Sequence, residues 1–214
     1  MSKKEDQNVQ GVNKPLMFRI ITLGNSGVGK TSIINRYTKN VFNDNNSSTI
    51  GINFFIKELY INKKKVEIKL IDTCGQEKYQ ALSKAYLKNT DACFFVFALN
   101  DKDSFDDIKK WMALFNQNQN INDIPHILLG NKSDLKPEVE ESIIDEFVNK
   151  EKIRYIKTSA KKNENINEAM EELCKLIFQK KNFSNTQSIN NIIISDKKTK
   201  KKKKKCLSWF SEIP

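Results

Sequence analysis

Short apolar runs alternate with longer amphipathic stretches along most of the chain, after a polar and aperiodic segment over residues 1–14. Runs of about four to eight apolar residues favour β-strands, whereas apolar residues spaced three and four apart favour helices. The repeated alternation predicts an α/β fold. The expected strands are Phe18–Leu23, Ile52–Ile61, Val66–Ile71, Ala92–Ala98, Ile127–Leu129 and Arg154–Lys157, and the expected helices are about Lys30–Thr38, Glu77–Lys88, Ser104–Asn116, Glu138–Asn149 and Ile166–Lys180.

Two features of the expected strands indicate how the sheet is built. Ala92–Ala98 is apolar at every position, which is typical of a central strand covered by helices on both faces. Ile52–Ile61 and Val66–Ile71 are separated by a polar turn over residues 62–65, which fits a hairpin. We therefore expect a six-stranded, mostly parallel sheet with one antiparallel edge strand and helices on both faces.

Charge is distributed unevenly along the chain. Lys and Arg total 37 against 26 Asp and Glu, a net charge of +11 that indicates an anionic partner, with nucleic acid and anionic membrane as the first alternatives. Residues 186–214 alone hold eight Lys and two acidic residues, and helical periodicity fades beyond Lys181. We expect a disordered N-terminal extension over residues 1–14, one folded domain over 15–182, and a flexible polybasic tail over 183–214.

Composition excludes several classes of protein. With 38% hydrophobic residues the chain is too apolar for a disordered protein, yet its longest apolar run, Ala92–Leu99, is far shorter than the roughly 20 residues of a transmembrane helix. The N-terminus lacks the apolar segment of a signal peptide, and Ser2 stands where myristoylation requires Gly. The four cysteines form no C-x-x-C pair. We expect a cytoplasmic protein with reduced thiols and neither a zinc site nor a disulfide framework.

A glycine-rich segment, GNSGVGKT over residues 24–31, lies between an expected strand and an expected helix and matches G-x-x-x-x-G-K-[ST]. Backbone N–H groups of such a loop bind phosphate oxygens, assisted by the helix N-terminus. Lys30 would neutralise the β and γ phosphates, and Thr31 would offer its hydroxyl to Mg²⁺. A glycine-rich turn with an exposed lysine is the structural alternative. The expected phosphate-binding residues are Ser26, Gly27, Val28, Gly29, Lys30, Thr31 and Ser32.

The base is indicated by residues 131–134, Asn-Lys-Ser-Asp, which follow an expected strand. An Asp in this place accepts two hydrogen bonds from the N1–H and N2–H₂ groups of guanine, a donor pair that adenine lacks. Together with the phosphate loop and three further boxes in the same order, these residues resemble the small GTPases of the Ras superfamily over about residues 16–180. The resemblance implies the P-loop GTPase fold, binding of GTP and GDP with Mg²⁺, and GTP hydrolysis.

By this resemblance several residues surround the guanine base. Lys132 would lie along the base, Asn131 would brace the phosphate loop, and Phe42 would pack on the base. Residues 158–161, Thr-Ser-Ala-Lys, would place the N–H of Ala160 at the guanine O6. The guanine-binding residues that the resemblance implies are Phe42, Asn131, Lys132, Asp134, Ser159, Ala160 and Lys161.

Two segments resemble the switches of the family. Thr49, in the segment over residues 48–51, would coordinate Mg²⁺ only when a γ-phosphate is present, which implies a loop with two states. In the segment over residues 72–77, Asp72 would hold Mg²⁺, the Gly75 N–H would meet the γ-phosphate and Gln76 would orient the attacking water. Gln is too weak a base for proton abstraction, so the role of Gln76 is positioning. The implied metal ligands are Thr31, Thr49 and Asp72.

Arginine is scarce in this chain. Arg19, Arg36 and Arg154 are its only arginines, and none lies in a switch segment. Some guanine-nucleotide proteins supply a transition-state arginine themselves. Because this one does not, we predict slow intrinsic hydrolysis and a GTPase-activating protein that supplies the arginine, worth about 10³–10⁵ in rate. The resemblance also implies an exchange factor, effector proteins and a monomeric state.

Segments over residues 49–55, 100–105 and 130–135 look most like the Rab branch, whose members regulate vesicle traffic. Four positions depart from the Rab pattern: Asn53 for Asp, Ile71 for Trp, Cys74 for Ala and Leu87 for Tyr. The missing Trp predicts a divergent set of effectors. Cys74 is interpreted as a small packing residue, with a redox sensor as the alternative. His126 has no catalytic partners in the sequence and is interpreted as structural.

The C-terminal tail departs from Rab proteins too. Cys206 is followed by eight residues, so it fits no prenylation signal. The lysine run, the apolar residues Leu207, Trp209 and Phe210, and palmitoylation of Cys206 would together form a reversible anchor on anionic membrane. This predicts peripheral association with the cytosolic face of an endomembrane. A solvated lysine run and a nuclear-localisation patch are the alternatives.

Three other functions compete with a GTPase switch. A guanine-nucleotide-binding scaffold with little turnover would fit the departures at Ile71 and Cys74. Nucleic-acid binding through the lysine run would persist without residues 16–182 and weaken steeply with salt. A small P-loop kinase is disfavoured, because such kinases commonly clamp phosphates with arginine-bearing lids. We expect a GTPase switch without specific nucleic-acid binding.

Overall fold

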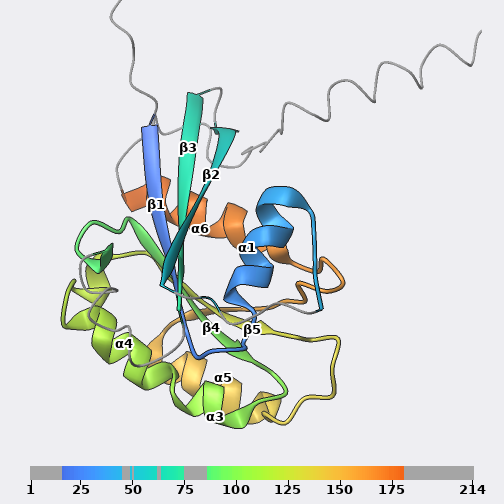
Figure 1. The fold of residues 1–214 in the computed structure, drawn as a ribbon. Coiled ribbons are helices and arrows are strands. Elements are labelled where there is room, and N and C mark those ends of the chain that lie inside the picture. Colours follow the sequence, from blue (N-terminus) through green and yellow to red (C-terminus); the bar gives the residue numbers. More distant parts are fainter. Residues whose placement is uncertain (1–15, 45–48, 50, 62–63, 75–85, 181–214) are drawn as a thin grey trace, which may run out of the picture.

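A single six-stranded sheet organises the computed structural model, which describes residues 16–44, 49, 51–61, 64–74 and 86–180 (Figure 1). The strands lie in the order β2-β3-β1-β4-β5-β6. Only β2 and β3 pair antiparallel, and all other neighbours pair parallel. The predicted mixed sheet with one antiparallel edge strand is confirmed. The strands are β1 Leu16–Leu23, β2 Ile52–Ile61, β3 Lys64–Thr73, β4 Ala92–Ala98, β5 His126–Asn131 and β6 Arg154–Lys157.

Helices cover both faces of this sheet, also as predicted. Figure 1 shows α1 and α6 on one side and α3, α4 and α5 on the other. The helices are α1 Lys30–Lys39, α3 Lys102–Asp106, α4 Ile108–Asn116, α5 Glu141–Glu151 and α6 Ile166–Lys180, with a short 3₁₀ helix at Ile121–Asp123. Most of the helix expected over residues 77–88 lies outside the described residues.

Two helix boundaries differ from the sequence prediction for local reasons. The helix expected over residues 104–116 is in fact two helices, α3 and α4, that meet at Asp107. Helix α3 begins at Lys102 because the Asp101 side chain accepts a hydrogen bond from the Ser104 N–H at 3.1 Å. The helix expected from Glu138 begins at Glu141. The N–H groups of Glu138 and Val139 donate to the Leu99 carbonyl instead, which ties them to the end of β4.

The hairpin between β2 and β3 is tighter than predicted. Ile61 pairs with Lys64, so the strands extend into the segment that the polar pattern assigned to the turn. Strand β5 is also longer than its apolar run, because pairing with β4 continues as far as Asn131. These extensions bring polar residues into regular structure at the ends of apolar strands.

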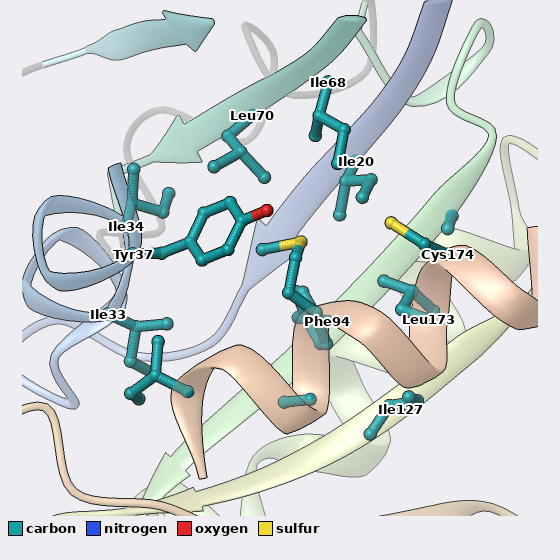
Figure 2. Close-up of a cluster of buried hydrophobic side chains, with 14 of the residues drawn as sticks. Ile20, Ile33, Ile34, Tyr37, Ile68, Leu70, Phe94, Ile127, Leu173 and Cys174 are labelled. Carbon is teal, nitrogen blue, oxygen red and sulfur yellow. The ribbon is translucent and has the colours of Figure 1, made fainter. Parts of the chain in front are cut away.

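The core consists of two apolar layers, one on each face of the sheet. Every residue of β4 is buried, as expected for its central position. Figure 2 shows the layer under α1 and α6, where helix side chains converge on the sheet. Its labelled residues include Ile33, Ile34 and Tyr37 from α1, Leu173 and Cys174 from α6, and Ile20, Ile68, Leu70, Phe94 and Ile127 from the strands.

The described cysteines are part of this packing. Cys74, Cys93 and Cys174 are buried free thiols. Burial raises the pKa of the Cys93 thiol and raises that of Cys174 to about 12, because the low-polarity interior disfavours the thiolate. Cys206 lies outside the described residues. None of the helices in the described ranges has the length and apolar run that a membrane crossing requires.

Candidate nucleotide-binding site

A pocket of about 350 Å³ opens beside the loops that follow β1, β5 and β6. These strands are parallel, and in parallel α/β sheets ligands bind where the carboxyl ends of the strands meet. Segments more than 100 residues apart in the sequence therefore share one cavity. Its lining is Ser26, Gly27, Gly29, Lys30, Thr31, Ser32, Phe42, Asn43, Asp44, Thr49, Thr73, Asn131, Lys132, Asp134, Leu135, Ala160 and Lys161.

Most of the residues predicted from the motifs line this pocket. Val28, Ser159 and Asp72 do not line it; all three are fully buried, and Asp72 contacts the pocket residue Thr31. Gly75 and Gln76 lie outside the described residues. Four further residues line the pocket without a role predicted from the sequence. Thr73 and Leu135 lie inside motif segments, whereas Asn43 and Asp44 belong to no motif and reach the lining through the path of the chain.

Glycine is required at two positions of the phosphate loop. Gly24 has a φ of 150°, and a Cβ there would lie 2.0 Å from the Val96 carbonyl oxygen. Gly29 has a φ of 97°, and a Cβ there would lie 2.3 Å from the side-chain nitrogen of Asn131. A side chain at either position would force the loop away from its neighbour, so the curled backbone depends on both glycines.

Lys30 is the buried cation of the pocket. Its side chain is only 5% exposed, and its Nζ donates to the carbonyls of Gly24 at 2.8 Å and Asn25 at 2.7 Å. Burial lowers the pKa of Lys30 to about 8, and the nearby Asp72 partly opposes this shift. The ammonium is thus held against the loop backbone, at the place where the motif predicts the phosphates.

Three oxygen-bearing side chains meet beside Lys30. The Thr31 hydroxyl lies 2.7 Å from the Thr49 hydroxyl and donates to Asp72 Oδ2 at 2.7 Å. Burial raises the pKa of Asp72, although the hydrogen bond from Thr31 and the charge of Lys30 act against the shift. The other carboxylate oxygen, Oδ1, is buried and has no hydrogen-bond partner among the described residues.

This group of oxygens fits a magnesium ion. Mg²⁺ prefers oxygen ligands and is usually held by one or two carboxylates together with substrate phosphates and water. The unsatisfied oxygen of Asp72 is the kind of atom that such a cation would satisfy. In the described part of the chain no three His, Cys, Asp or Glu side chains cluster, and Asp72 is the carboxylate of this group.

Asn131 joins the two ends of the pocket. Its side-chain nitrogen donates to the Val28 carbonyl of the phosphate loop at 2.8 Å, which is the bracing that the resemblance implied. Its side-chain oxygen accepts from the Ala160 N–H at 3.2 Å and from the Thr158 hydroxyl at 3.4 Å. The Ala160 N–H, which the resemblance assigned to the base, therefore already has a partner in Asn131.

The Asp134 carboxylate is held by a second layer of contacts. Ser159 donates its hydroxyl to Asp134 Oδ1 at 2.5 Å and accepts from the Lys162 N–H at 3.0 Å. Ser159 is fully buried, so this support is shielded from water. Lys161 forms an ion pair with Asp44 at 3.2 Å across the pocket opening.

Arg36 supports the same loop from α1, a role that the sequence did not predict. Its Nε donates to the Ala160 carbonyl at 2.8 Å, and its Nη2 donates to the Lys161 carbonyl at 3.1 Å. Its guanidinium carbon also lies 5.9 Å from the centre of the Phe42 ring. No sequence motif signals an arginine one and a half turns after the phosphate loop.

None of the arginines lines the described pocket. Arg19 is in β1, Arg36 reaches the loop carbonyls from outside the cavity, and Arg154 pairs with Glu172 at 2.7 Å. As predicted from the sequence, Arg36 lies on a helix and Arg19 and Arg154 lie on strands.

The departures from the Rab pattern occupy different environments. Ile71 is 2% exposed and pairs with Phe54 across the β2–β3 ladder. Phe54 is exposed, and its ring centre lies 5.3 Å from that of Tyr86. Leu87 is fully buried, and Cys74 is 4% exposed with its N–H donating to the Gly51 carbonyl, which favours a packing role.

His126 is structural, as interpreted from the sequence. Its Nδ1 lies 2.7 Å from the Ile124 carbonyl oxygen, and its ring contacts the ring of Phe95.

Comparison with known proteins yields one family. The sequence profile of the Ras family matches residues 19–179. The chain is 37% identical to the Ras-related protein Rab-11B of Dictyostelium discoideum over 179 residues, which cover 82% of this chain and 81% of that protein. It is 34% identical to the Ras-related protein Rab-13 of Bos taurus, with 86% of this chain and 91% of that protein covered. It is 30% identical to Rab-30 of Homo sapiens, with 89% of this chain and 95% of that protein covered.

Proposed function

This chain belongs to the Ras family of small GTPases and is Rab-like, and from that membership we propose that it is a GTP-hydrolysing switch in vesicle traffic. The observation that carries the proposal is the convergence of the phosphate loop and both base-recognition loops on one pocket. In the proposed complex GTP or GDP occupies this pocket, with its phosphates at Lys30 and its base at Asp134.

The phosphate end of the pocket favours a polyphosphate. The backbone N–H groups of the loop bind phosphate oxygens, and the Lys30 ammonium, which donates to the Gly24 and Asn25 carbonyls, has a third N–H for a phosphate oxygen. Thr31, Thr49 and Asp72 hold Mg²⁺, which neutralises charge on the phosphates when bound. Thr49, which lies beside Thr31, would coordinate Mg²⁺ only while the γ-phosphate is present. Loss of the γ-phosphate would therefore release Thr49, which gives the switch its two states.

The base end favours guanine. The Asp134 carboxylate accepts from the two adjacent donors of the guanine edge while the Ser159 hydroxyl fixes its orientation. Lys132 and Phe42 line the pocket where their side chains can cover the base. Adenine presents a single amino donor and an acceptor ring nitrogen to the same carboxylate, so Asp134 disfavours it.

Hydrolysis in this proposal depends on Gln76 and on a partner. Gln76 orients the attacking water, and the Gly75 N–H stabilises the γ-phosphate. Because no arginine lines the described pocket, a GTPase-activating protein supplies the missing charge, worth about 10³–10⁵ in rate. An exchange factor reloads the protein with GTP, and effectors bind the GTP state.

The proposed location is the cytosolic face of an endomembrane, where the polybasic tail binds anionic lipid and Cys206 provides a palmitoylation site. The support for this placement is the similarity of the chain to Rab proteins. Sedimentation with anionic liposomes, comparing the full chain with a form truncated after Ser195, tests it. Equal binding of both forms would contradict a tail anchor, and accumulation of the tagged chain in the nucleus would favour the nuclear-signal alternative.

Single-turnover GTP hydrolysis tests the proposed activity. We expect the purified full chain to hydrolyse GTP slowly, cell extract to accelerate it, and Gln76→Leu to abolish the accelerated rate. Gln117→Leu, at an exposed position after α4, serves as the matched control and should leave the rate unchanged. No turnover with or without extract would favour a nucleotide-binding scaffold, and fast turnover by the isolated chain would contradict the need for a partner arginine.

A further inference from the structure

Asn25, the second residue of the phosphate loop, is bound from outside the pocket by the junction of α3 and α4. We propose that Asp107 and Trp111 at this junction form, with Asn25, a clamp that positions the phosphate loop for nucleotide binding. The inference rests on the proposed function, because the clamp acts on the loop that holds the phosphates. Asn25, Asp107 and Trp111 are positioning residues, since none of them lines the pocket.

The hydrogen bonds of the clamp are mutually consistent. The indole Nε1–H of Trp111 donates to Asn25 Oδ1 at 2.7 Å, and Asn25 Nδ2 donates to Asp107 Oδ2 at 2.8 Å. An indole N–H can only donate, and a carboxylate can only accept. The amide of Asn25 therefore accepts from one neighbour and donates to the other, which an Asp of the same shape could not do. The two neighbours also determine which way the amide is turned.

The clamp is connected directly to the buried lysine. The backbone carbonyl of Asn25 accepts from Lys30 Nζ at 2.7 Å, while the side chain of Asn25 points to the helices. On its other side is Gly24, whose backbone passes too close to Val96 for any side chain. A shift of Asn25 would thus move a carbonyl ligand of Lys30 and alter the loop backbone beside it.

The helix junction is built to hold Asp107 in place. Asp107 lies between α3 and α4, at the break that the amphipathic pattern did not predict. Its Oδ1 pairs with Lys110 at 2.5 Å, which leaves Oδ2 directed at Asn25. Trp111 is 6% exposed and packs in the core layer on that side of the sheet. Two anchored side chains therefore hold one loop residue.

Charge exchange between Asn25 and Asp107 tests the clamp. N25D places two carboxylates at the distance of the present hydrogen bond, so repulsion displaces the loop, and we expect GDP to dissociate at least about tenfold faster. D107N alone keeps a bond, because the new amide can turn its oxygen toward Asn25, and we expect a change below about threefold. In N25D/D107N the new amide donates to the new carboxylate, and the dissociation rate should return to within about threefold of the wild-type rate.

A matched control exists elsewhere in the chain. Asn120 Nδ2 donates to Asp123 Oδ2 at 2.8 Å, the same pairing at the same distance, on an exposed 3₁₀ turn outside the pocket. N120D creates the same repulsion there and should leave GDP dissociation unchanged. The readout is the dissociation rate of fluorescent GDP from the full chain with Mg²⁺ present, with circular dichroism to verify folding of each variant.

Trp111 fluorescence supplies a second readout for variants whose circular dichroism shows that they are folded. In a W209F background Trp111 is the remaining tryptophan. We expect a red shift of its emission in N25D, reversed in N25D/D107N. An N25D variant that folds and releases GDP at the wild-type rate, or a double variant no better than N25D, would overturn the clamp. A wild-type chain that binds no GDP would instead overturn the proposed function.

Discussion

The side-chain nitrogen of Asn131 donates to the backbone carbonyl of Val28 at 2.8 Å, across a separation of 103 residues. This bond ties the base-recognition loop after β5 to the phosphate loop after β1. The two ends of the pocket therefore do not move independently.

Asn131→Ala should weaken GDP binding about 10- to 100-fold. The change leaves the Val28 carbonyl and the Ala160 N–H without their partner, and each unsatisfied buried group costs about 1–3 kcal/mol. Asn122→Ala, at an exposed position, is the control. Equilibrium titration with fluorescent GDP measures the effect, and an unchanged dissociation constant would show that the link is not needed for binding.

Arg36→Ala should accelerate GDP release about five- to tenfold, because the carbonyls of Ala160 and Lys161 lose their shared donor and the loop gains freedom. Arg36→Lys should recover only part of the loss, since one ammonium cannot reproduce the planar fork of donors. Lys39→Ala, on the same helix, is the comparison. Equal rates of GDP release from Arg36→Ala and Lys39→Ala would refute a specific role for the guanidinium.

Alkaline pH should destabilise the fold through Cys174. The pKa of its thiol rises from an ordinary 9.0 to about 12 on burial, so the stability due to the neutral thiol is complete below pH 9 and is lost as pH rises towards 12. Between pH 8 and 10.5 the loss from this group is about 2 kcal/mol. Urea unfolding of wild type and Cys174→Ala at both pH values measures it. The free energy of unfolding of Cys174→Ala should fall correspondingly less between the two pH values than that of the wild type. An equal fall in both proteins would contradict the assignment to Cys174.

Effector binding should differ from that of typical Rab proteins. Ile71 is buried beside Phe54, so the exposed aromatic surface near Tyr86 lacks the Trp that the Rab pattern has at this position. We expect capture experiments with GTP-loaded protein to recover partners outside the common Rab effectors, and Phe54→Ala to abolish their capture. Recovery of common Rab effectors alone would count against a divergent set.

The sheet was predictable because its strands alternate with amphipathic helices and because β4 is apolar on both faces. The pocket was predictable where contiguous motifs supply it, as in the loop around Lys30. The break at Asp107 was not, because the apolar spacing continues through it, and the contact of Asp107 with Asn25, 82 residues away, was not predictable either. The support from Arg36 was equally hidden, since it depends on how α1 packs beside the loop at Ala160. Long-range polar contacts of this kind leave no periodic trace in a sequence.

Nucleotide competition with and without a change at Asp134 tests the central claim, that this pocket binds guanine nucleotides. Fluorescent GDP bound to the full chain with Mg²⁺ should be displaced by GDP and GTP but not by ADP. Asp134→Asn replaces the acceptor of the guanine donors with an amide that can donate to xanthine O2, so the variant should bind GDP at least about tenfold more weakly and bind xanthosine diphosphate more tightly. Displacement by ADP as effective as that by GDP, or a variant with unchanged preference, would contradict guanine recognition in this pocket.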